Sequence, residues 1–535
     1  MESTAELIQR AAEKFGNRTF LYFKNRTISF RQMDEVSDNL AGAFHRLGLK
    51  KGDRVAVMLM NRPEYLHLWF GLNKIGASMV PINVDFTVYE TQYLLDHSES
   101  VMAITDSAHF DIVDLARKDC PGIQSMIVLD TSSAPPGCVL FSDLLRHGQA
   151  PQETPTISCD DEAAVLYTSG TTGRPKGCLV NQYYYLNLGA MYVREHMVGD
   201  KDVILTPLPL FHMNAQTLTI MGALTAGASV VLVDRFHPST WWQDIQKHQV
   251  TFFHYLGVIP AMLMGIAESE YDYGGKTVYG IGAGVPKDIQ EKFEKRFNVA
   301  LLEVYGSTEG GGGGLFLTGR RLKERKPGTA AFGKLLPEVE ARIVDDNDRS
   351  VPDGTVGELL TRSSDKIFRR KGFMSGYLKD QDATAEVWRN GWFHTGDYCY
   401  RDEDGYYHFV DRKKDVIRRS GENISASEVE SVLSDHPDVL DAAVIAVPDS
   451  IRIEEVKAYV VPCEGVSLPP EHLIQWCEQR LAYYKIPRFI EFRDSLPKTA
   501  TQKIQKNVLK SEVEDLIAHS WDRTRHMKLH REKRR

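Results

Sequence analysis

The sequence predicts an α/β protein with a large N-terminal region and a small α+β domain near its C-terminal end. Over about the first 150 residues, short apolar runs alternate with helical patterns, which is typical of a sheet with helices on its faces. A chain of 535 residues is long enough for several packed layers and more than one domain. A hydrophobic content of 42% and a charged content of 25% are ordinary for a globular protein.

Apolar spacing predicts the elements of the first region. Residues 31–47 have helical spacing before Gly48, and residues 65–75 form a second helix that ends at Gly76. Residues 1–15 form an amphipathic pattern that contains acidic residues, which excludes a secretory signal peptide. Buried strands are expected at 54–59, 101–104 and 125–129.

Residues 167–177, YTSGTTGRPKG, combine the groups that bind a polyphosphate, and an apolar strand pattern precedes them. Glycines let backbone N–H groups approach an anion, hydroxyls add donors, and Lys176 adds a positive charge. The spacing differs from a Walker A loop, because Pro175 replaces its glycine and Gly177 follows the lysine. The candidate phosphate ligands are Thr168, Ser169, Gly170, Thr171, Thr172, Gly173 and Lys176.

The middle of the chain continues the alternation of strands and helices. Ser239 or Thr240 is expected to cap a helix that carries Trp241 and Trp242 as packing residues. Further strands are expected at 203–205, 228–233, 250–253, 277–279 and 300–304. Antiparallel strands at 339–344 and 358–360, joined by the turn 345–354, indicate a β subdomain. The last domain is expected to have strands at 406–410, 440–447 and 457–461 and helices at 427–433 and 473–483.

The segment 167–177 resembles the signature phosphate loop of the adenylate-forming enzymes, which include acyl-CoA synthetases, carrier-protein adenylation domains and firefly-type luciferases. More motifs of that family follow in the family's order, so the resemblance covers nearly the whole chain. These motifs are YGSTE at 305–309, GWFHTGD at 391–397, DRKKD at 411–415 and LPKTATQKI at 496–504. The resemblance implies an N-terminal domain of stacked mixed sheets with flanking helices and a β subdomain, followed by a small mobile α+β domain. The implied boundaries are 1–410, a hinge at 411–415, 416–519 and a tail at 520–535.

The resemblance implies a nucleotide site built from the YGSTE motif. Tyr305 can stack on a purine, and Thr308 can donate a hydrogen bond to the α-phosphate. Glu309 offers a hard oxygen ligand to Mg²⁺, which binds few carboxylates beside phosphate oxygens. Asp397 can accept hydrogen bonds from both ribose hydroxyls, and Arg412 resembles a ribose-contacting arginine. The other implied nucleotide contacts are Gly306, Ser307, Gly282, Ala283 and Gly284, where small residues let a planar base approach the backbone.

An acyl pocket is implied on the same basis. Prolines after the strand at 203–205 lead to a loop at the end of the sheet, where sites of α/β proteins lie. The family borders the acyl pocket and the nucleotide there with an aromatic–histidine step, which matches Phe211 and His212. His212 is therefore a catalytic candidate as well. The remaining pocket candidates are Tyr255, Gly257, Val258 and Gly310.

The C-terminal domain carries the implied catalytic lysine and a CoA-facing loop. Lys503 has the place of the family's lysine, which bridges the carboxylate and the α-phosphate as charge builds up. Gln502 stands where the family has glycine, which is a departure in the loop that holds this lysine. Lys414 corresponds to the hinge position. Arg418, Gly421 and Glu422 resemble the loop that meets the pantetheine arm of CoA.

Two segments have more than one interpretation. The glycine run Gly310–Gly314 is either a pocket floor without side chains or a mobile loop over the site, since consecutive glycines cost folding entropy. The basic tail, 520–535, is expected to be a disordered terminus, with a nucleic-acid or membrane contact as the alternative.

The predicted activity is an ATP-dependent acid–CoA ligase with ATP, Mg²⁺ and CoA as ligands. The alternatives are an enzyme that loads a carrier protein, a luciferase-like oxygenase and a non-catalytic nucleotide-binding protein. The net charge of −8 gives no support to nucleic-acid binding, and no apolar run is long enough to span a membrane. Seven scattered cysteines suit a reducing compartment, so we expect a cytoplasmic protein, with a homodimer left open.

The acid is the open part of the prediction. Residues 449–452 and 456–459 resemble crotonobetaine/carnitine–CoA ligases, but the C-terminal domain does not hold the acyl group. A trimethylammonium acid would require an aromatic cage, for which Tyr183, Tyr184, Tyr185 and Tyr255 are candidates. Medium-chain and aromatic acids stay equally open.

Overall fold

The computed structural model describes residues 3–527 with several gaps. The gaps are 148, 152, 169–173, 269–277, 286, 315, 318–324, 330, 346, 413–415, 498–503, 505 and 513–514. Several predicted site residues therefore lie outside the described residues. They are Ser169, Gly170, Thr171, Thr172, Gly173, Lys414 and Lys503. The side chain of Arg412 is also outside the description.

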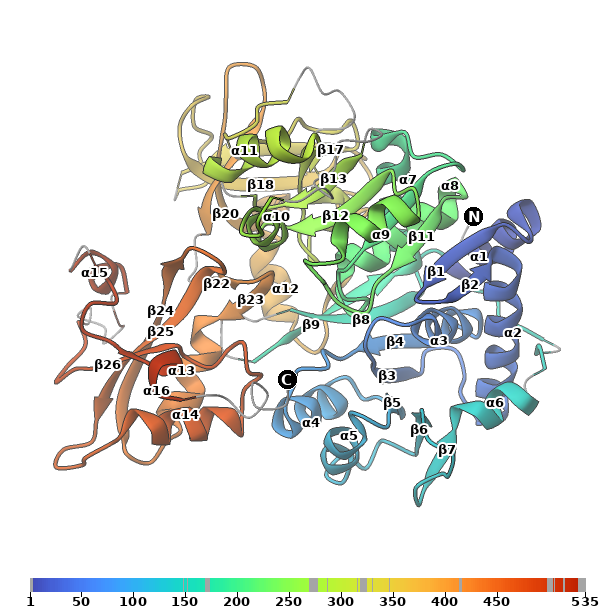
Figure 1. The fold of residues 1–535 in the computed structure, drawn as a ribbon, viewed down its shortest axis with the longest axis horizontal. Coiled ribbons are helices and arrows are strands. Elements are labelled where there is room, and N and C mark those ends of the chain that lie inside the picture. The colour runs from blue at the N-terminus through green and yellow to red at the C-terminus, as the bar shows by residue number, and fades with distance from the viewer. Residues whose placement is uncertain are drawn as a thin grey trace. The chain divides into compact units, whose positions relative to one another are not determined.

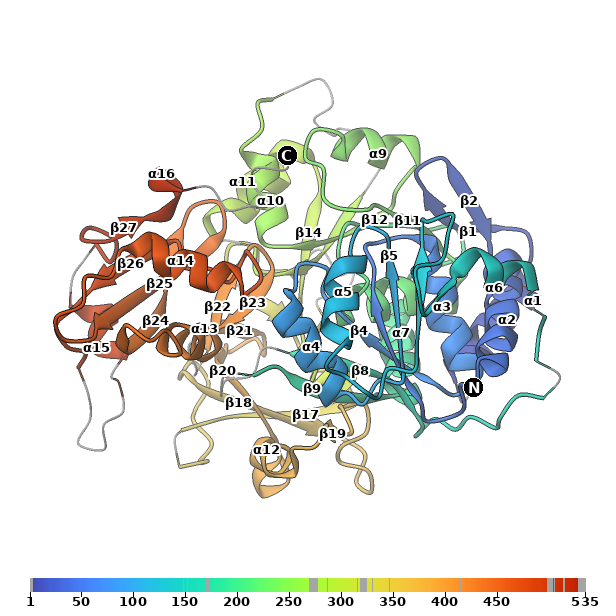
Figure 2. The same ribbon diagram turned by 90° about the horizontal axis from the view of Figure 1, so that it is seen from below.

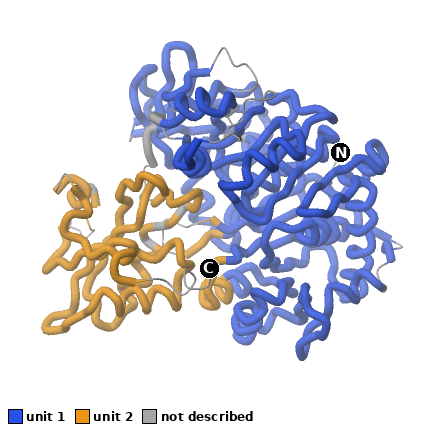
Figure 3. The backbone as a smooth tube through the Cα atoms, in the orientation of Figure 1, with its two compact units in different colours: residues 1–84, 94–167, 177–413 blue, residues 85–93, 168–176, 414–535 orange. Residues whose placement is uncertain are grey.

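The chain divides into two compact units, coloured separately in Figure 3. Unit 1 comprises residues 1–84, 94–167 and 177–413, and unit 2 comprises residues 85–93, 168–176 and 414–535. Each unit has its own core of buried apolar side chains. The division after residue 413 falls within 411–415, the segment that resembles a hinge.

One sheet of unit 1 is mixed, with the strand order β15-β14-β13-β12-β10-β11-β1-β2 (Figures 1 and 2). Its strands are β1 (Thr19–Phe23), β2 (Arg26–Ser29), β10 (Val203–Thr206), β11 (Ser229–Leu232), β12 (Phe252–Leu256), β13 (Tyr279–Ala283), β14 (Ala300–Tyr305) and β15 (Phe316–Leu317). Strands β11, β10, β12, β13 and β14 pair in parallel. Their carboxyl ends therefore lie at the same edge of the sheet, where ligands bind in α/β folds.

A second mixed sheet has the order β19-β9-β8-β4-β3-β5-β6-β7. Its strands are β3 (Arg54–Met58), β4 (Ser78–Pro81), β5 (Met102–Asp106), β6 (Ser125–Leu129), β7 (Cys138–Leu140), β8 (Glu162–Thr168), β9 (Lys176–Asn181) and β19 (Gly376–Tyr377). Strands β8 and β9 are neighbours, so the predicted phosphate loop connects two adjacent strands. The close approach of β9 to β8 requires Gly177, because a Cβ there would press on the Val165 side chain.

Helices pack around these sheets, and α1, α2 and α3 lie together in both views (Figures 1 and 2). Helix α2 begins with a capping box, in which the side chains of Ser29 and Gln32 bond each other's backbone N–H groups. The helices of the N-terminal part are α1 (Thr4–Phe15), α2 (Phe30–Arg46), α3 (Pro63–Lys74), α4 (Val88–His97), α5 (Phe110–Arg117), α6 (Phe141–His147) and α7 (Gln182–His196). Later helices are the π-helix η1 (Ala215–Met221), α8 (Gly222–Ala226), α9 (Trp241–Lys247), α10 (Val258–Met264), α11 (Lys287–Phe297), the 3₁₀ helix η2 (Gly311–Gly314), α12 (Gln381–Val387) and η4 (Arg389–Gly391).

The predicted β subdomain is a sheet with the order β16-β21-β20-β18-β17. Its strands are β16 (Ala331–Gly333), β17 (Val339–Val344), β18 (Gly357–Ser363), β20 (Phe393–Arg401) and β21 (Tyr407–Arg412). Strands β17 and β18 pair antiparallel, as the turn between them predicts. The predicted α/β class with stacked mixed sheets and a β subdomain is confirmed.

Unit 2 is built on a sheet in which β24 and β25 form a long antiparallel hairpin. Its strands are β22 (Val416–Arg419), β23 (Glu422–Ser425), β24 (Val439–Asp449), β25 (Ile453–Pro462), β26 (Phe489–Phe492) and β27 (Trp521–Asp522). Its helices are α13 (Ala426–Ser434), α14 (Pro470–Glu478), α15 (Lys506–Ser511) and α16 (Arg523–His526). Helix α14 ends five residues before the predicted 473–483 pattern does, because Arg480, Leu481 and Lys485 bond back in turns instead of a continued helix.

The tail differs from the expected disordered terminus. Residues 521–526 form β27 and α16, and β27 pairs antiparallel with β26. Asp522 caps the helix by accepting the Thr524 N–H, and the side chain of Arg523 is buried. This order has a physical source, because a buried arginine and a paired strand hold the segment to the domain. Residues 528–535 are outside the described residues.

Candidate active site

Loops that leave four parallel strands of unit 1 bring the predicted nucleotide and acyl residues to one edge of the sheet. Strand β10 leads to Phe211 and His212, β12 to Gly257, β13 to Gly284 and β14 to residues 306–310. The parallel register pairs Tyr255 with Gly282 and Leu256 with Ala283, which aligns the ends of β12 and β13. The sequence motifs are therefore neighbours in space although they are far apart in the chain.

The turn after β14 is fixed by hydrogen bonds to its backbone. The Gly310 N–H donates to Ser307 Oγ at 2.9 Å, and the Gly311 N–H donates to the Ser307 carbonyl at 2.9 Å. The hydroxyl of Tyr184, on α7, donates to the Thr308 carbonyl at 2.8 Å. The side chains of Thr308 and Glu309 are half-buried on this rigid turn. The turn can therefore present both groups to a ligand without reorganisation.

The described part of the glycine run packs tightly against its neighbours. Gly311 has φ 48°, and a Cβ there would collide with the Tyr184 ring and the Gly372 carbonyl oxygen. A Cβ on Gly312 would collide with the Asn187 side chain. Gly310, Gly311 and Gly312 are buried. The absent side chains of the described part of the run therefore allow a close contact with α7.

Glu309 lies beside a second anchored side chain. The Tyr377 hydroxyl donates to Glu309 Oε1 at 3.3 Å, and the Met374 N–H donates to the Glu309 carbonyl at 3.1 Å. Burial, as the larger cause, and the nearby Glu309 carboxylate, as the smaller one, raise the pKa of Tyr377 well above its usual range. The phenol therefore keeps its proton and stays a hydrogen-bond donor. Tyr377 is on β19, which pairs with β9, the strand that leaves the phosphate loop. No cluster of three metal-ligating side chains occurs among the described residues.

Asp397 and Tyr305 come from separate motifs and meet in the structure. The Tyr305 hydroxyl donates to Asp397 Oδ2 at 2.6 Å, and the Tyr305 ring stacks on Phe332 with centroids 4.6 Å apart. Asp397 is on β20, where its backbone pairs with that of Arg412 on β21. A carboxylate held in this way keeps lone pairs directed for further donors, such as a pair of hydroxyls.

The ends of β12 and β13 are joined by a buried carboxylate, Glu303, which sequence reasoning missed. Glu303 Oε1 accepts from the Tyr255 hydroxyl at 2.5 Å, and Oε2 accepts from the Gly284 N–H at 2.8 Å. Burial raises the pKa of Glu303 to about 7, although these hydrogen bonds act to lower it. The only signal was a charged residue inside the apolar strand ALLEVY, which indicates a buried acid with partners.

Glycines let the two strand ends approach each other. A Cβ on Gly257 would overlap with the Gly284 carbonyl oxygen, and one on Gly282 would overlap with the Tyr255 carbonyl oxygen. A Cβ on Gly284 would meet no atom within 4 Å, so this position faces open space. Val258 is buried at the start of α10.

Phe211 and His212 lie on a loop that Asn61 holds in place. The Asn61 side chain accepts from the Leu210 N–H at 2.7 Å and donates to the Leu208 carbonyl at 3.0 Å. The Phe211 and His212 rings are in edge contact, with centroids 4.7 Å apart, and both residues are half-buried.

Three of the four candidate cage tyrosines are enclosed by the protein. Tyr184, Tyr185 and Tyr255 have no exposed surface. Their hydroxyls donate to the Thr308 carbonyl, to Gln216 Oε1 and to Glu303 Oε1. These three rings are core residues of the described structure and offer no face to a cation.

The candidate CoA-facing residues lie at the turn between β22 and β23 in unit 2. Arg419 pairs with Glu422 across the turn, while Ser420 and Gly421 have φ values of 51° and 92°. The Arg418 N–H donates to Glu454 Oε2 at 2.6 Å. Glycine suits this left-handed backbone, and Ser420 adopts it against its usual preference.

Comparison with known families decides the kinship of the chain. The model of the AMP-binding enzymes matches residues 8–378, and the model of their C-terminal domain matches residues 428–503. The chain belongs to the AMP-binding enzyme family. The predicted resemblance to adenylate-forming enzymes is thereby confirmed.

Similar proteins in this family are CoA ligases. Crotonobetaine/carnitine–CoA ligase of Salmonella paratyphi A is 34% identical over 512 residues, which covers 93% of this chain and 97% of that protein. The enzyme with the same name from Proteus mirabilis is also 34% identical, with the same coverage. Among solved structures, o-succinylbenzoate–CoA synthetase of Bacillus subtilis has a TM-score of 0.82 at 25% identity and covers 94% of this chain and 98% of its own. ATP-bound MatB of Rhodopseudomonas palustris has a TM-score of 0.69 at 26% identity, with coverage of 97% and 100%.

These matches confirm the predicted class of enzyme, an AMP-forming ligase that joins an acid to CoA through an adenylate. In the part of the chain that the structure describes, no helix combines the length and apolar character needed to cross a bilayer.

Proposed function

We propose that Asp397, Tyr305 and the turn 306–309 hold the adenosine monophosphate part of ATP while a carboxylic acid attacks the α-phosphate. The observation that carries this assignment is the 2.6 Å contact between Tyr305 and Asp397, which joins two motifs 92 residues apart at the carboxyl edge of the sheet. A ribose needs an acceptor for two hydroxyls, and a purine needs a flat surface beside it. The Asp397 carboxylate and the Tyr305 ring are the groups that we assign to these two roles.

The reaction has two steps. A carboxylate oxygen bonds to the α-phosphorus of ATP while the bond to pyrophosphate breaks, which gives an acyl-adenylate. The CoA thiol then loses its proton and its sulfur attacks the acyl carbon, which releases AMP and leaves the thioester. Backbone and hydroxyl donors at the turn after β14 stabilise the charge that develops on the α-phosphate.

Magnesium fits this site as a partner of Glu309. Mg²⁺ binds proteins through one or two carboxylates together with substrate phosphates and waters, which agrees with a single carboxylate on a rigid turn. The bound ion would neutralise phosphate charge. The Tyr377 hydroxyl orients the Glu309 carboxylate for that role.

Two lysines and the small domain complete the proposal. Lys176, the first residue of β9, binds the β- and γ-phosphates with the loop before it. Lys503 assists adenylation, and Arg418, Gly421 and Glu422 meet CoA after the C-terminal domain turns about Lys414. The scattered cysteines, all seven within the described residues and all free thiols, support a reducing compartment such as the cytoplasm.

Three classes of acid are candidate substrates: betaine-type, medium-chain and aromatic acids. Betaine-type acids come first because the similar enzymes are named for crotonobetaine and carnitine. The burial of Tyr184, Tyr185 and Tyr255 weighs against a cationic cage made by these three residues, so uncharged acids belong in the same panel. Medium-chain and aromatic acids are its uncharged members.

The test is pyrophosphate release from ATP and Mg²⁺ with a panel of these acids, with and without CoA. Release that depends on particular acids, with thioester formed only when CoA is added, is the expected result. Lys503→Ala should abolish adenylation and spare thioester formation from supplied acyl-adenylate. Equal loss of both steps in that variant would contradict the assignment of Lys503.

A further inference from the structure

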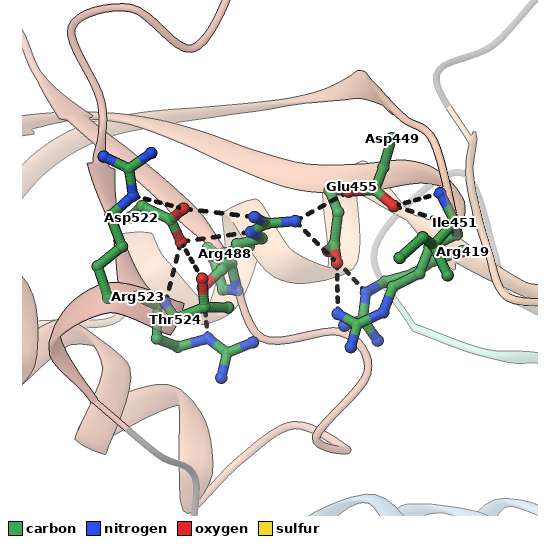
Figure 4. A network of polar contacts seen from close by, with 11 residues as sticks. Arg419, Asp449, Ile451, Glu455, Arg488, Asp522, Arg523 and Thr524 are labelled. Carbon is green, nitrogen blue, oxygen red and sulfur yellow. Dashed lines mark hydrogen bonds and ion pairs between the residues drawn. The ribbon is translucent and has the colours of Figure 1, made fainter. Parts of the chain in front are cut away.

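The guanidinium of Arg488 joins three carboxylates within unit 2 (Figure 4). Arg488 Nη1 donates to Asp449 Oδ2 at 2.8 Å and lies 3.9 Å from Glu455 Oε1. On the other side, Nε and Nη2 lie 3.3 Å from the two oxygens of Asp522. Burial opposes ionisation of Asp522, yet bonds from Arg488 and Thr524 hold the pKa of its carboxyl below the usual range. Asp522 is therefore ionised near neutral pH, and its contact with Arg488 is an ion pair.

One arm of the network fixes the β24–β25 hairpin turn. Asp449 Oδ1 accepts from the N–H groups of Ile451 and Arg452 at 3.0 and 2.8 Å. The Arg452 carbonyl in turn accepts from the Ser420 N–H at 3.0 Å. Two hydrogen bonds, both made by the backbone of Arg452, thus connect Asp449 to the turn that carries Gly421.

A second arm reaches the same turn through Glu455. Glu455 has no exposed surface, and its Oε2 accepts from Arg419 Nε at 2.7 Å. Its Oε1 accepts from Arg452 Nη1 at 2.6 Å. Arg419 is itself almost fully buried and directly precedes Ser420. Ser420 is a non-glycine residue at φ 51°, so its backbone needs such outside restraints to keep this conformation.

The tail supplies the outer end of the network. Phe489 and Asp522 pair across β26 and β27, which places Asp522 beside Arg488. The Arg523 N–H donates to the Arg488 carbonyl at 2.8 Å. Thr524 donates to Asp522 Oδ1 through both its N–H and its hydroxyl, at 2.9 and 2.7 Å. Asp522 is therefore held rigidly against Arg488.

We propose that residues 521–526 are a positioning element for thioester formation, which act through the Asp522–Arg488 pair to hold the Ser420–Gly421 turn in its productive conformation. This inference rests on the proposed function, in which that turn meets CoA. Asp522 and Arg488 are positioning residues. Adenylation does not use the turn, so their effect is confined to the second step.

The test separates the two half-reactions in Asp522→Asn. Pyrophosphate release should change by less than about twofold, whereas kcat/KM for CoA with supplied acyl-adenylate should fall at least about tenfold, since small misplacements of a site cost factors of this order. Arg488→Lys keeps the charge but loses the fork, so it should show the same split. Asp353→Asn is the matched control, because Asp353 pairs with Arg401 Nε and Nη2 at 2.8 and 3.0 Å in the β subdomain. It should alter neither step.

Thr524→Val provides a milder variant if Asp522→Asn does not fold. It removes the hydroxyl donor to Asp522 and keeps every charge, and it should lower only the CoA step, by about threefold. A parallel fall of both steps, or no change in the CoA step, would overturn the inference. A wild-type chain that forms adenylate but no thioester would instead overturn the proposed acceptor and this inference with it.

Discussion

The buried carboxylate of Glu303 makes the stability of unit 1 depend on pH. Its pKa is raised from 4.5 to about 7, mainly by burial. Each pKa unit corresponds to about 1.4 kcal/mol, so ionisation of Glu303 costs the folded state about 3 kcal/mol. The folded protein holds this proton more tightly than the unfolded chain between pH 4.5 and 7. The Glu303 contribution to the free energy of unfolding is therefore present below this window and is lost as pH rises through it.

The variant Glu303→Gln removes this titration and keeps the shape of the side chain. For each pH, the free energy of unfolding of the variant is subtracted from that of the wild type. This difference should be about 3 kcal/mol larger at pH 4.5 than at pH 8. A constant offset from altered hydrogen bonds to Tyr255 and Gly284 does not affect this difference between the two pH values.

Urea unfolding at a series of pH values measures the effect. Glu291→Gln is the control, since Glu291 is an exposed residue on α11, and its curve should run parallel to that of the wild type. Curves for Glu303→Gln and wild type that stay parallel within about 1 kcal/mol from pH 4.5 to 8 would refute the reasoning. The same variant should lower kcat/KM for the acid, because Glu303 fixes the edge of β13.

Other substitutions test the turn and the nucleotide site. Gly311→Ala should cost about 2–4 kcal/mol of stability from overpacking and left-handed strain, whereas Gly354→Ala, with φ 80° and open space around it, should cost about 1–2 kcal/mol. Equal melting temperatures of the two variants would refute the packing role of the glycine run. Asp397→Asn should raise the KM for ATP by about tenfold to a hundredfold, as expected for a lost bond to a charged acceptor. Tyr377→Phe should raise the Mg²⁺ concentration for half-maximal pyrophosphate release by about threefold to tenfold through a less ordered Glu309, and an unchanged Mg²⁺ dependence would contradict that link.

Local periodicity predicted most strands and helices of the fold because burial on one face leaves a short-range signal. The strand predicted at 54–59 is β3, and the helix predicted at 31–47 is α2, whose capping box is visible in the sequence. The order of strands within each sheet left no such signal. Strands β10 and β13 both flank β12, although β13 follows it and β10 precedes it by more than forty residues.

The residues of the candidate site were also predicted only in part. Tyr305, Thr308, Glu309 and Asp397 lie in contiguous motifs, so the order of residues along the chain is enough to indicate them. The purpose of the glycine run was not visible, because it depends on α7, which lies more than a hundred residues earlier. Sequence alone could count the glycines but could not show what their missing side chains leave room for.

The groups that sequence reasoning missed share one property, which is that their partners are distant in the chain. Glu303 binds Tyr255 from 48 residues away, and Arg488 binds Asp522 from 34 residues away. Residues that touch a ligand can be recognised alone, because the chemistry of the ligand restricts each of them. A supporting residue is restricted only by the group that it supports. It can therefore be recognised only when its partner is also known. Charged residues inside apolar strands and at ends of domains are therefore the places in a sequence where such pairs should be sought, since a buried charge without a partner is too costly to persist.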